Sequence, residues 1–405
     1  MRLLPDPHGL VIALLVAGAM GGPPPAPAQF IDHFDGPSIA LDESAARGWA
    51  YLTGEGETTM TVEQGGKGFA SIRVDATGDR RNVWWALVKR QVSDRLDLEA
   101  LARPEHELRI EARIRVSNAP RRVNLHLNTQ RTTDFHSHLM EFDIPDATGW
   151  HTIWMTTRGF DARPGDRVYG QLALMDWGRG QHRVDLDYFK VEVVNATTVV
   201  SDSENAVPYH PPLADPDGFE HRLPAAADAT LDLAHPDVNL NNWSAADGEG
   251  RARLIAVSGT QHAVLRFDLR RLAGRRASGS GLLEVTSHSV QRSSDDVKDF
   301  GLVRVVEILG GDDAWDQTTV TFSSLCRGAP PEAVFNPQMI IDWPVVESRA
   351  GKTYFTIPRP VLQRLIEGRT HGLALTPLGA ITAAFYATEH DGGRLAPRLL
   401  LNVRD

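Results

Sequence analysis

Alternation of apolar and polar residues, repeated in short runs along the chain, is the feature that most constrains the fold. Two clear runs are residues 107–116 and 183–193, which are rich in Val, Ile, Leu, Phe and Tyr. A period of two is typical of strands with one buried face. Turn signals such as residues 118–120 and 162–166 separate the runs. We therefore predict an all-β protein made of two β-sandwich, jelly-roll-like domains.

Domain boundaries are suggested by length and by one region of unusual composition. The chain has 405 residues, enough for two or three domains. Pro and acidic residues are concentrated in residues 196–224, and this composition predicts a Pro-rich linker. The predicted domains are residues 30–195 and residues 225–405. Convincing helical periodicity occurs at residues 360–368, where one or two turns should end at Gly368.

The first 28 residues have the pattern of a secretory signal peptide. Residues 10–20 are apolar but too few to span a bilayer, and Ala26-Pro27-Ala28 fits a cleavage site. We therefore expect a secreted or periplasmic protein. The rest of the sequence contains no candidate membrane span.

Composition and motifs argue against several function classes. The net charge is -10, and no Lys/Arg tract indicates nucleic-acid binding. The single cysteine, Cys326, can form no intramolecular disulfide. The sequence has no G-x-S-x-G elbow, P-loop or H-E-x-x-H motif. A serine hydrolase, a P-loop nucleotide-binding protein and a zinc protease of these types are therefore not expected.

The carboxy-terminal half carries a series of motifs in a recognisable order. They are ADAT (227–230), HAVLRFDL (262–269), AWDQTTVTF (314–322), FYATE (385–389) and RLAPRL (394–399). This order resembles DNRLRE-type β-sandwich modules of secreted carbohydrate-active proteins, some of which are grouped with carbohydrate-binding modules. The resemblance implies a β-sandwich and sugar binding. Trp315 is expected in the core, and Trp243, in a polar loop, is the candidate sugar-stacking ring.

The amino-terminal half begins with IDHFDG (31–36) and closes with VDLDYFKV (184–191). This pairing looks like the first and last strands of secreted jelly-roll domains that bind or cleave sugars. The resemblance implies a structural Ca²⁺ between those strands. Asp35 and Asp187 are the candidate ligands, since calcium prefers carboxylate and carbonyl oxygens.

A polar stretch, NLHLNTQRTTDFHSHLMEFDIP over residues 124–145, is predicted to form a hairpin that turns at residues 131–135. In its first run, alternate residues point to opposite faces of the sheet. The polar side chains that share one face are Asn124, His126, Asn128 and Gln130.

Register decides whether the histidines of the second run join that polar face, because a shift of one residue moves every side chain to the other face. If Gln130 pairs with His136, the amides and the histidines share a face. If Gln130 pairs with Phe135, they lie on opposite faces, and the leucines of the first run meet Met140 and Phe142 in the core. The apolar partners favour the second register, which places the His-x-His pair at the rim of the core face.

Sugar binding is one chemistry that suits this stretch. Amide and imidazole groups donate hydrogen bonds to hydroxyls and accept them, while aromatic rings supply apolar platforms. The candidate ligand-binding residues are Asn124, Asn128, Gln130, Trp84, Trp85, Trp177 and Trp243.

Catalysis and metal binding are the other chemistries, beside a polar face without any ligand. Cleavage of a polysaccharide would need a carboxylate neutraliser, a base and an acid. The candidate catalytic residues are His126, Arg131, His136, His138 and Tyr188, with Asn124 or Tyr169 as further members. A metal would bind the His-x-His pair together with His126 or Glu141, although Glu141 has the wrong parity to share their face.

We predict from these patterns a secreted protein that binds polysaccharide or oligosaccharide. One alternative is a polysaccharide lyase or glycoside hydrolase with its site in the amino-terminal domain and an accessory binding module behind it. The other is a cell-surface structural module without a sugar ligand. Enzymatic activity stays open at this point.

Overall fold

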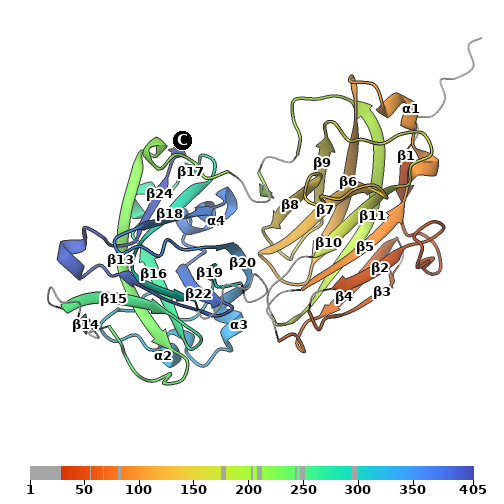
Figure 1. Ribbon diagram of the computed structural model, residues 1–405. Helices are drawn as coiled ribbons and strands as arrows, with labels where there is room; N and C mark the ends of the chain where they lie inside the picture. The colour runs from red at the N-terminus through yellow and green to blue at the C-terminus, as the bar shows by residue number, and fades with distance from the viewer. Residues whose placement is uncertain are drawn as a thin grey trace, which may run out of the picture.

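The protein consists of two β-rich lobes that lie side by side (Figure 1). The computed structural model describes residues 29–405 apart from residues 55, 67, 81–83, 175–178, 202–203, 208–211, 242–243, 247–250 and 293–299. The predicted signal peptide and the candidate residues Trp177 and Trp243 lie outside this described part.

The amino-terminal lobe is a sandwich of two antiparallel six-stranded sheets. Sheet 1 has the order β3-β4-β11-β6-β9, and β1 also pairs with β11. Its strands are β1 (Gln29–Asp32), β3 (Thr59–Gly66), β4 (Phe69–Asp75), β6 (His106–Val116), β9 (His151–Thr157) and β11 (Gln181–Asn195). Sheet 2 has the order β12-β8-β7-β10-β5-β2. Its strands are β2 (Ala50–Gly54), β5 (Trp85–Gln91), β7 (Arg121–Thr129), β8 (Leu139–Ile144), β10 (Val168–Leu174) and β12 (Ala206–Val207).

The core of this lobe forms between the inner faces of the two sheets. Along β6, every second residue from Leu108 to Ile114 is fully buried in it, as the alternation of residues 107–116 predicts. From sheet 2, the apolar residues of β7 enter the same core. Burial of one face per strand explains why period-two patterning dominates the sequence.

The carboxy-terminal lobe contains an eleven-stranded sheet system with the order β14-β15-β23-β18-β24-β13-β16-β22-β19-β20, in which β21 also pairs with β18, and a separate pair β17-β25. The strands are β13 (His221–Asp232), β14 (Ser244–Ala246), β15 (Arg251–Val257), β16 (Gln261–Phe267), β17 (Arg276–Ala277), β18 (Gly281–Arg292), β19 (Leu302–Ile308), β20 (Phe335–Trp343), β21 (Lys352–Ile357), β22 (Gly372–Leu378), β23 (Ile381–Tyr386), β24 (Arg398–Leu401) and β25 (Val403–Arg404). Long strands such as β18 change partners along their length: its first half pairs with β21 and its second half with β23. The apolar side chains of this lobe form two core clusters. Trp315 is buried in the second cluster, as expected. The prediction of an all-β protein with two β-sandwich domains is confirmed.

Helices are few and short. The α-helices are α1 (Leu98–Leu101), α2 (Phe322–Cys326), α3 (Pro331–Val334) and α4 (Arg359–Ile366), and the 3-10 turns are η1 (Ser93–Arg95), η2 (Pro216–Gly218), η3 (Arg270–Leu272) and η5 (His390–Gly393). The predicted helix near residues 360–368 is α4, and Gly368 follows it with a φ of 71°. This left-handed conformation is one that glycine adopts without strain. Within the described residues, no helix is long and apolar enough to cross a membrane.

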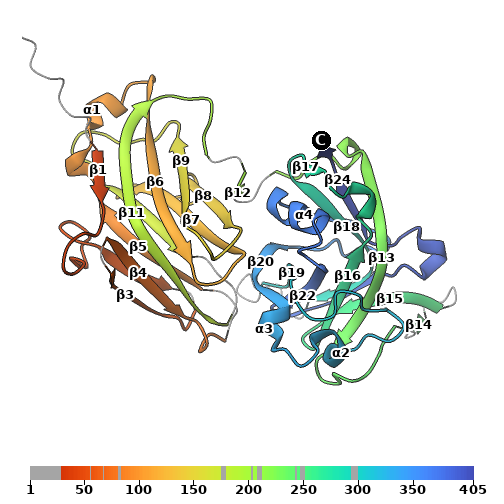
Figure 2. The same ribbon diagram turned by 180° about the vertical axis from the view of Figure 1, so that it is seen from behind.

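The segment predicted as a linker contributes structure to the amino-terminal lobe where it is described. Ala206 and Val207 form β12, the edge strand of sheet 2 beside β8. Ser201 makes an isolated bridge to Met155 of β9. The two lobes then meet where β20 and α4 of the second lobe face β7 and β8 of the first (Figures 1 and 2).

Candidate functional site: the polar face of sheet 2

The predicted hairpin is formed by β7 and β8, and its register is the favoured one. Leu125 pairs with Met140, and Val123 pairs with Phe142. These pairs point into the core, so the polar residues of β7 point away from it. We call the outward side of sheet 2 the polar face.

Neighbouring strands extend the polar face in cross-strand rows. In one row, Lys89 of β5, Gln171 of β10 and His126 of β7 stand next to one another. In the adjacent rows, Tyr169 pairs with Asn128, and Ala173 pairs with Asn124. Directly paired residues in antiparallel strands point to the same side. Three strands that are distant in sequence therefore combine their side chains on one surface.

Burial of polar groups without partners distinguishes this surface. Asn124 is 1% exposed and His126 is 5% exposed. Three side-chain atoms have no hydrogen-bond partner among the described residues. They are Oδ1 and Nδ2 of Asn124 and Nε2 of His126. By contrast, Gln171 Nε2 donates a hydrogen bond to Asn128 Oδ1. A buried polar group without a partner costs about 1–3 kcal/mol, which a polar ligand can recover.

His126 is held in its neutral form by its surroundings. Burial lowers the pKa of His126 to about 4, and electrostatic repulsion involving the nearby His136, His138 and Lys89 side chains acts in the same direction. The ring is packed edge-on against Phe135 with 6.0 Å between the ring centroids. Neutral imidazole has one donor and one acceptor nitrogen, so His126 offers a directional hydrogen bond rather than a charge.

An apolar strip flanks the polar groups on the β5 and β2 side. Trp85 and Leu87 of β5 are half-buried, and Leu52 of β2 is exposed. The Trp85 ring lies over Gly54, its cross-strand partner, where any Cβ would collide with the ring. Tyr169 is buried, and Lys89 Nζ lies over its ring, 4.0 Å from the centroid. A half-buried ring such as that of Trp85 is a suitable platform for the apolar face of a sugar.

The opposite edge of the polar face is closed by the second lobe. Arg122 Nη1 donates to Glu141 Oε2 at 3.1 Å, and the backbone N–H of Arg122 donates to Gln338 Oε1 of β20 at 2.6 Å. Asp143 receives both terminal nitrogens of Arg364 from α4, at 2.7 and 2.9 Å. Both carboxylates on this edge are therefore occupied by arginines, and Glu141 cannot join the His-x-His pair.

The predicted His-x-His pair lies beside the polar face rather than on it. His138 is half-buried at the rim of the core, with its ring centroid 5.0 Å from that of Phe160. Burial lowers the pKa of His138. His136 is exposed in the hairpin loop and lies 3.6 Å from Asp134.

Gln130 and Arg131 serve the neighbouring loop. Arg131 Nη2 donates to Asp166 Oδ2 at 2.7 Å, and Nη1 donates to Asp161 Oδ2 at 2.8 Å. Gln130 Nε2 donates to the same Asp166 at 2.7 Å. Side-chain hydrogen bonds from Arg131 lower the pKa of Asp166 and of Asp161. This cluster joins the β7–β8 turn to the loop before β10.

Three other candidates lie away from the polar face. Trp84 is a core residue whose ring stacks on His182 at 5.5 Å. Tyr188 lies on the outward face of sheet 1 and donates to Glu111 Oε1 at 2.7 Å. Asp187 accepts a hydrogen bond from Arg113 Nη1 at 2.8 Å. Tyr188 therefore does not meet His126, which belongs to the other sheet.

The predicted calcium ligands have ordinary surroundings. Asp35 is exposed after β1, and Asp187 is occupied by Arg113. Across the described part of the chain, no group of three or more His, Cys, Asp or Glu side chains is arranged to hold a metal ion. Calcium binding at Asp35 and Asp187 stays a prediction.

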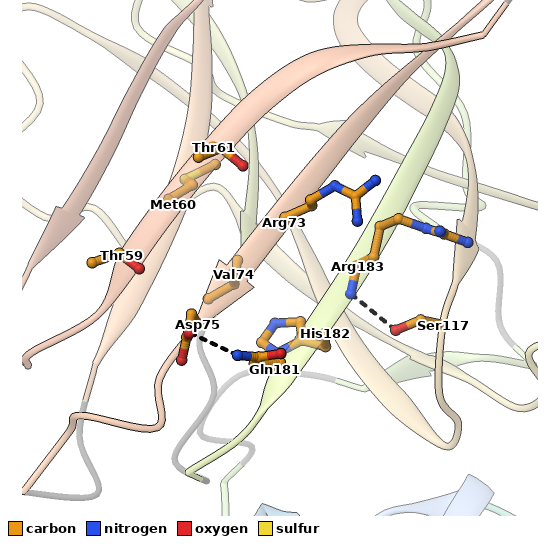
Figure 3. Close-up of a pocket in the computed structure, with 10 residues that line it drawn as sticks. All are labelled: Thr59, Met60, Thr61, Arg73, Val74, Asp75, Ser117, Gln181, His182 and Arg183. Atoms are coloured by element: carbon orange, nitrogen blue, oxygen red, sulfur yellow. Dashed lines mark hydrogen bonds between the residues drawn. The ribbon is translucent and has the colours of Figure 1, made fainter.

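A pocket of about 440 Å³ opens on the outward face of sheet 1 (Figure 3). Arg73 and Arg183 lie along it, and Gln181 Nε2 donates to Asp75 Oδ2 at 2.8 Å. Arg73 pairs with Glu63 at 2.8 Å, and Arg183 pairs with Asp185 at 3.1 Å. Its charged groups already have protein partners, so this pocket is a weaker candidate site than the polar face.

Sequence reasoning identified Trp85 of β5 but missed Lys89 of the same strand and Gln171 of β10. Tyr169, a candidate for catalysis, also belongs to the polar face. The run YGQLA (169–173) contains the signal, since Gln171 interrupts an otherwise apolar strand. No pattern within a single strand states which strand will pair with β7.

Comparisons with known proteins give only distant likenesses. No protein-family model matches the chain, and no curated protein matches it. A family 11 carbohydrate-binding module from Clostridium thermocellum, solved with a β-1,3-1,4-mixed-linked tetrasaccharide, is 15% identical over 41% of this chain and 96% of its own, with a TM-score of 0.26. A CBM4 structure is 16% identical over 40% of this chain and 97% of its own, with a TM-score of 0.29.

A tandem CBM22-1–CBM22-2 structure from Paenibacillus barcinonensis Xyn10C spans both lobes. It is 11% identical over 94% of this chain and 98% of its own, with a TM-score of 0.27. All three TM-scores lie below 0.5, so these likenesses carry no argument about the site.

Proposed function

We propose that this protein binds carbohydrate, as a polysaccharide or an oligosaccharide, on the polar face of sheet 2. The observation that carries the proposal is the pair Asn124 and His126: both are buried, and the side-chain amide of Asn124 and the Nε2 atom of His126 have no partner among the described residues. Sugar hydroxyls both donate and accept hydrogen bonds, as these amide and imidazole groups require.

Shape and composition of the face support the same ligand. Polar groups on β7 and β10 lie next to half-buried Trp85 and Leu87 of β5 and exposed Leu52 of β2. A carbohydrate ring has the same division, with polar edges and apolar faces. Trp85 is the half-buried ring on the polar face that is best placed to stack on a sugar. The amides of Asn124 and Asn128 would orient the sugar through hydrogen bonds.

Binding is better supported than cleavage. A lyase site would need Arg131 and Tyr188 beside His126, but Arg131 is paired with two aspartates and Tyr188 belongs to sheet 1. His126 Nε2 makes no hydrogen bond to an acid or base of the described residues, as a catalytic pair would require. Export through residues 1–28, DNRLRE-type identity of the second lobe and a calcium ion at Asp35 and Asp187 remain proposals on sequence grounds.

Replacing Asn124 tests the proposal. Affinity electrophoresis of the full chain against neutral and acidic polysaccharides should show retardation by at least one polymer. Asn124→Ala should weaken that binding roughly tenfold or more, because the ligand loses hydrogen bonds in a buried site. The free energy of unfolding should not fall by more than about 1 kcal/mol, because the amide has no protein partner to lose and its removal relieves the cost of an unpartnered buried group.

Asn195→Ala provides the matched control, since Asn195 is exposed at the end of β11 in the other sheet. It should leave retardation unchanged. Absence of retardation by every polymer, or equal retardation of wild type and Asn124→Ala, would contradict the proposed function.

A further inference from the structure

The charge of the polar face is opposite to that of the chain as a whole. The chain carries a net charge of -10. On the polar face, however, Glu141 beside Asn124 is paired with Arg122, and His126 is neutral. The remaining charged group beside the buried amides is Lys89, and Arg167 lies close enough to act on it. A local excess of positive charge therefore exists where the ligand would lie.

Lys89 has no carboxylate partner within the described part of the chain. Its Nζ lies over the Tyr169 ring at 4.0 Å, and its strand position is next to Gln171 and Ala50. Burial and the charge of Arg167 lower the pKa of Lys89, and no acidic group counteracts them. A half-buried ammonium group in such surroundings is more stable when an anion is present.

Among the described acidic residues near the face, Asp134 lies 3.6 Å from His136, and four others are paired with arginines. Glu141 is paired with buried Arg122, and Asp143 is paired with Arg364. On the loop side, Asp161 and Asp166 are both held by Arg131. None of these four carboxylates is available to neutralise Lys89, so the face presents cations and neutral amides to a ligand.

We infer that the polar face selects acidic glycans, whose carboxylate or sulfate groups pair with Lys89 while their hydroxyls bind Asn124 and His126. This inference rests on the proposed function and narrows its ligand class. A local site is required, because a chain of net charge -10 does not attract polyanions in general.

Lys89→Gln tests the inference, because it removes the charge and keeps most of the side-chain length. The full chain is titrated with polygalacturonate, with dextran sulfate and with a neutral mixed-linkage β-glucan. Wild type should bind at least one acidic polymer roughly tenfold more tightly than the glucan. Lys89→Gln should remove most of that preference, and Lys89→Arg should retain it. The two acidic polymers distinguish carboxylate from sulfate as the recognised group.

Lys190→Gln is the matched control. Lys190 lies on β11 of sheet 1 and is half-buried like Lys89, but it is paired with Glu192 at 2.7 Å. It should leave the preference unchanged. Thermal melts of each variant would confirm that the fold is kept.

These experiments distinguish a failure of the inferred acidic preference from a failure of the proposed function. If Asn124→Ala abolishes binding but wild type prefers the neutral glucan, or Lys89→Gln keeps the full acidic preference, the inference is wrong and the proposed function stands. If no polymer binds, or Asn124→Ala has no effect, both are wrong.

Discussion

Buried polar side chains in this protein differ in whether other parts of the chain provide their hydrogen-bond partners. Asn124 and His126 have unpartnered buried atoms on the outward side of sheet 2, and Asp228 has one in the second lobe. Asp228 Oδ2 accepts a hydrogen bond from the backbone N–H of Thr388 at 2.8 Å, but Oδ1 has no partner among the described residues. Burial, with the nearby charge of Glu389, raises the pKa of Asp228 to about 7.

We expect Asp228→Asn to stabilise the protein at alkaline pH. The folded-state pKa lies above the usual 3.8, so ionisation penalises the folded state as pH rises from about 4 through about 7. Asparagine can still accept the bond from Thr388 but carries no charge. Denaturant unfolding should show equal stability near pH 4 and a gain for the variant at pH 8 of at most on the order of 4 kcal/mol.

Asp237→Asn is the control, because Asp237 is exposed on the loop that follows β13. Asp237→Asn should change the free energy of unfolding little at pH 8, because this side chain is exposed. A loss of stability in Asp228→Asn at pH 8 would show instead that a positive group or cation holds the ionised form.

At the scale of elements, close approach of the two sheets depends on one glycine of β10. Gly170 faces the core, and a Cβ at this position would lie 2.8 Å from Phe189 Cε1 and 3.0 Å from Val191 Cγ2 of β11. The missing side chain lets the aromatic ring of sheet 1 fill the space under the polar face. This packing keeps Tyr169 and Gln171, its chain neighbours, in position.

Gly170→Ala should destabilise the protein by about 1–3 kcal/mol, because the added methyl group forces the ring or β10 to move. Denaturant unfolding measures the loss, and sugar affinity should fall with it as β10 shifts. Gly149→Ala should change neither quantity much, since nothing lies within 4 Å of a Cβ at Gly149. Equal stability of the two variants would mean that the sheets tolerate a wider separation.

For the whole molecule, a buried ionic cluster joins the two lobes. Arg364 of α4 is 3% exposed and is bonded to Asp143 of β8 and to Glu307 of β19. Burial opposes its charge, but the two carboxylates raise the pKa of Arg364 above its usual value. Thr370 Oγ1 and Asn336 Nδ2 also donate to Glu307, at 2.7 and 3.2 Å. The second lobe is thereby fixed against one edge of the polar face.

Arg364→Ala should cost about 3–5 kcal/mol of unfolding free energy, because it leaves two buried carboxylates without a cation. We expect the lobes to unfold in two separate transitions in calorimetry. The combined change Arg364→Met, Asp143→Leu and Glu307→Leu should recover most of the lost free energy of unfolding.

Arg327→Ala is the control. It removes an exposed ion pair with Asp312 and should cost less than about 1 kcal/mol. A single transition with near-normal stability in Arg364→Ala would argue against a fixed lobe arrangement.

Much of the fold and part of the site could be predicted because side-chain alternation is a local property of strands. Apolar alternation identified the strands, and matching Leu125 with Met140 and Val123 with Phe142 identified the register of the β7–β8 hairpin. That register also placed Asn124, His126 and Asn128 on one face and the His-x-His pair off it. Hydrophobic pairing across a short turn is strong enough to be visible in sequence.

Only the tertiary structure decided what surrounds those residues. It brought Gln171 and Lys89 beside His126, put Trp84 in the core and Trp85 on the polar face, and engaged Glu141 and Asp143 with arginines. The physical reason is that alternation says which side chains share a face of one strand, whereas the site depends on which strands and which lobe lie next to it. Those contacts arise from burial between segments as distant as Asp143 and Arg364, and no local pattern encodes them.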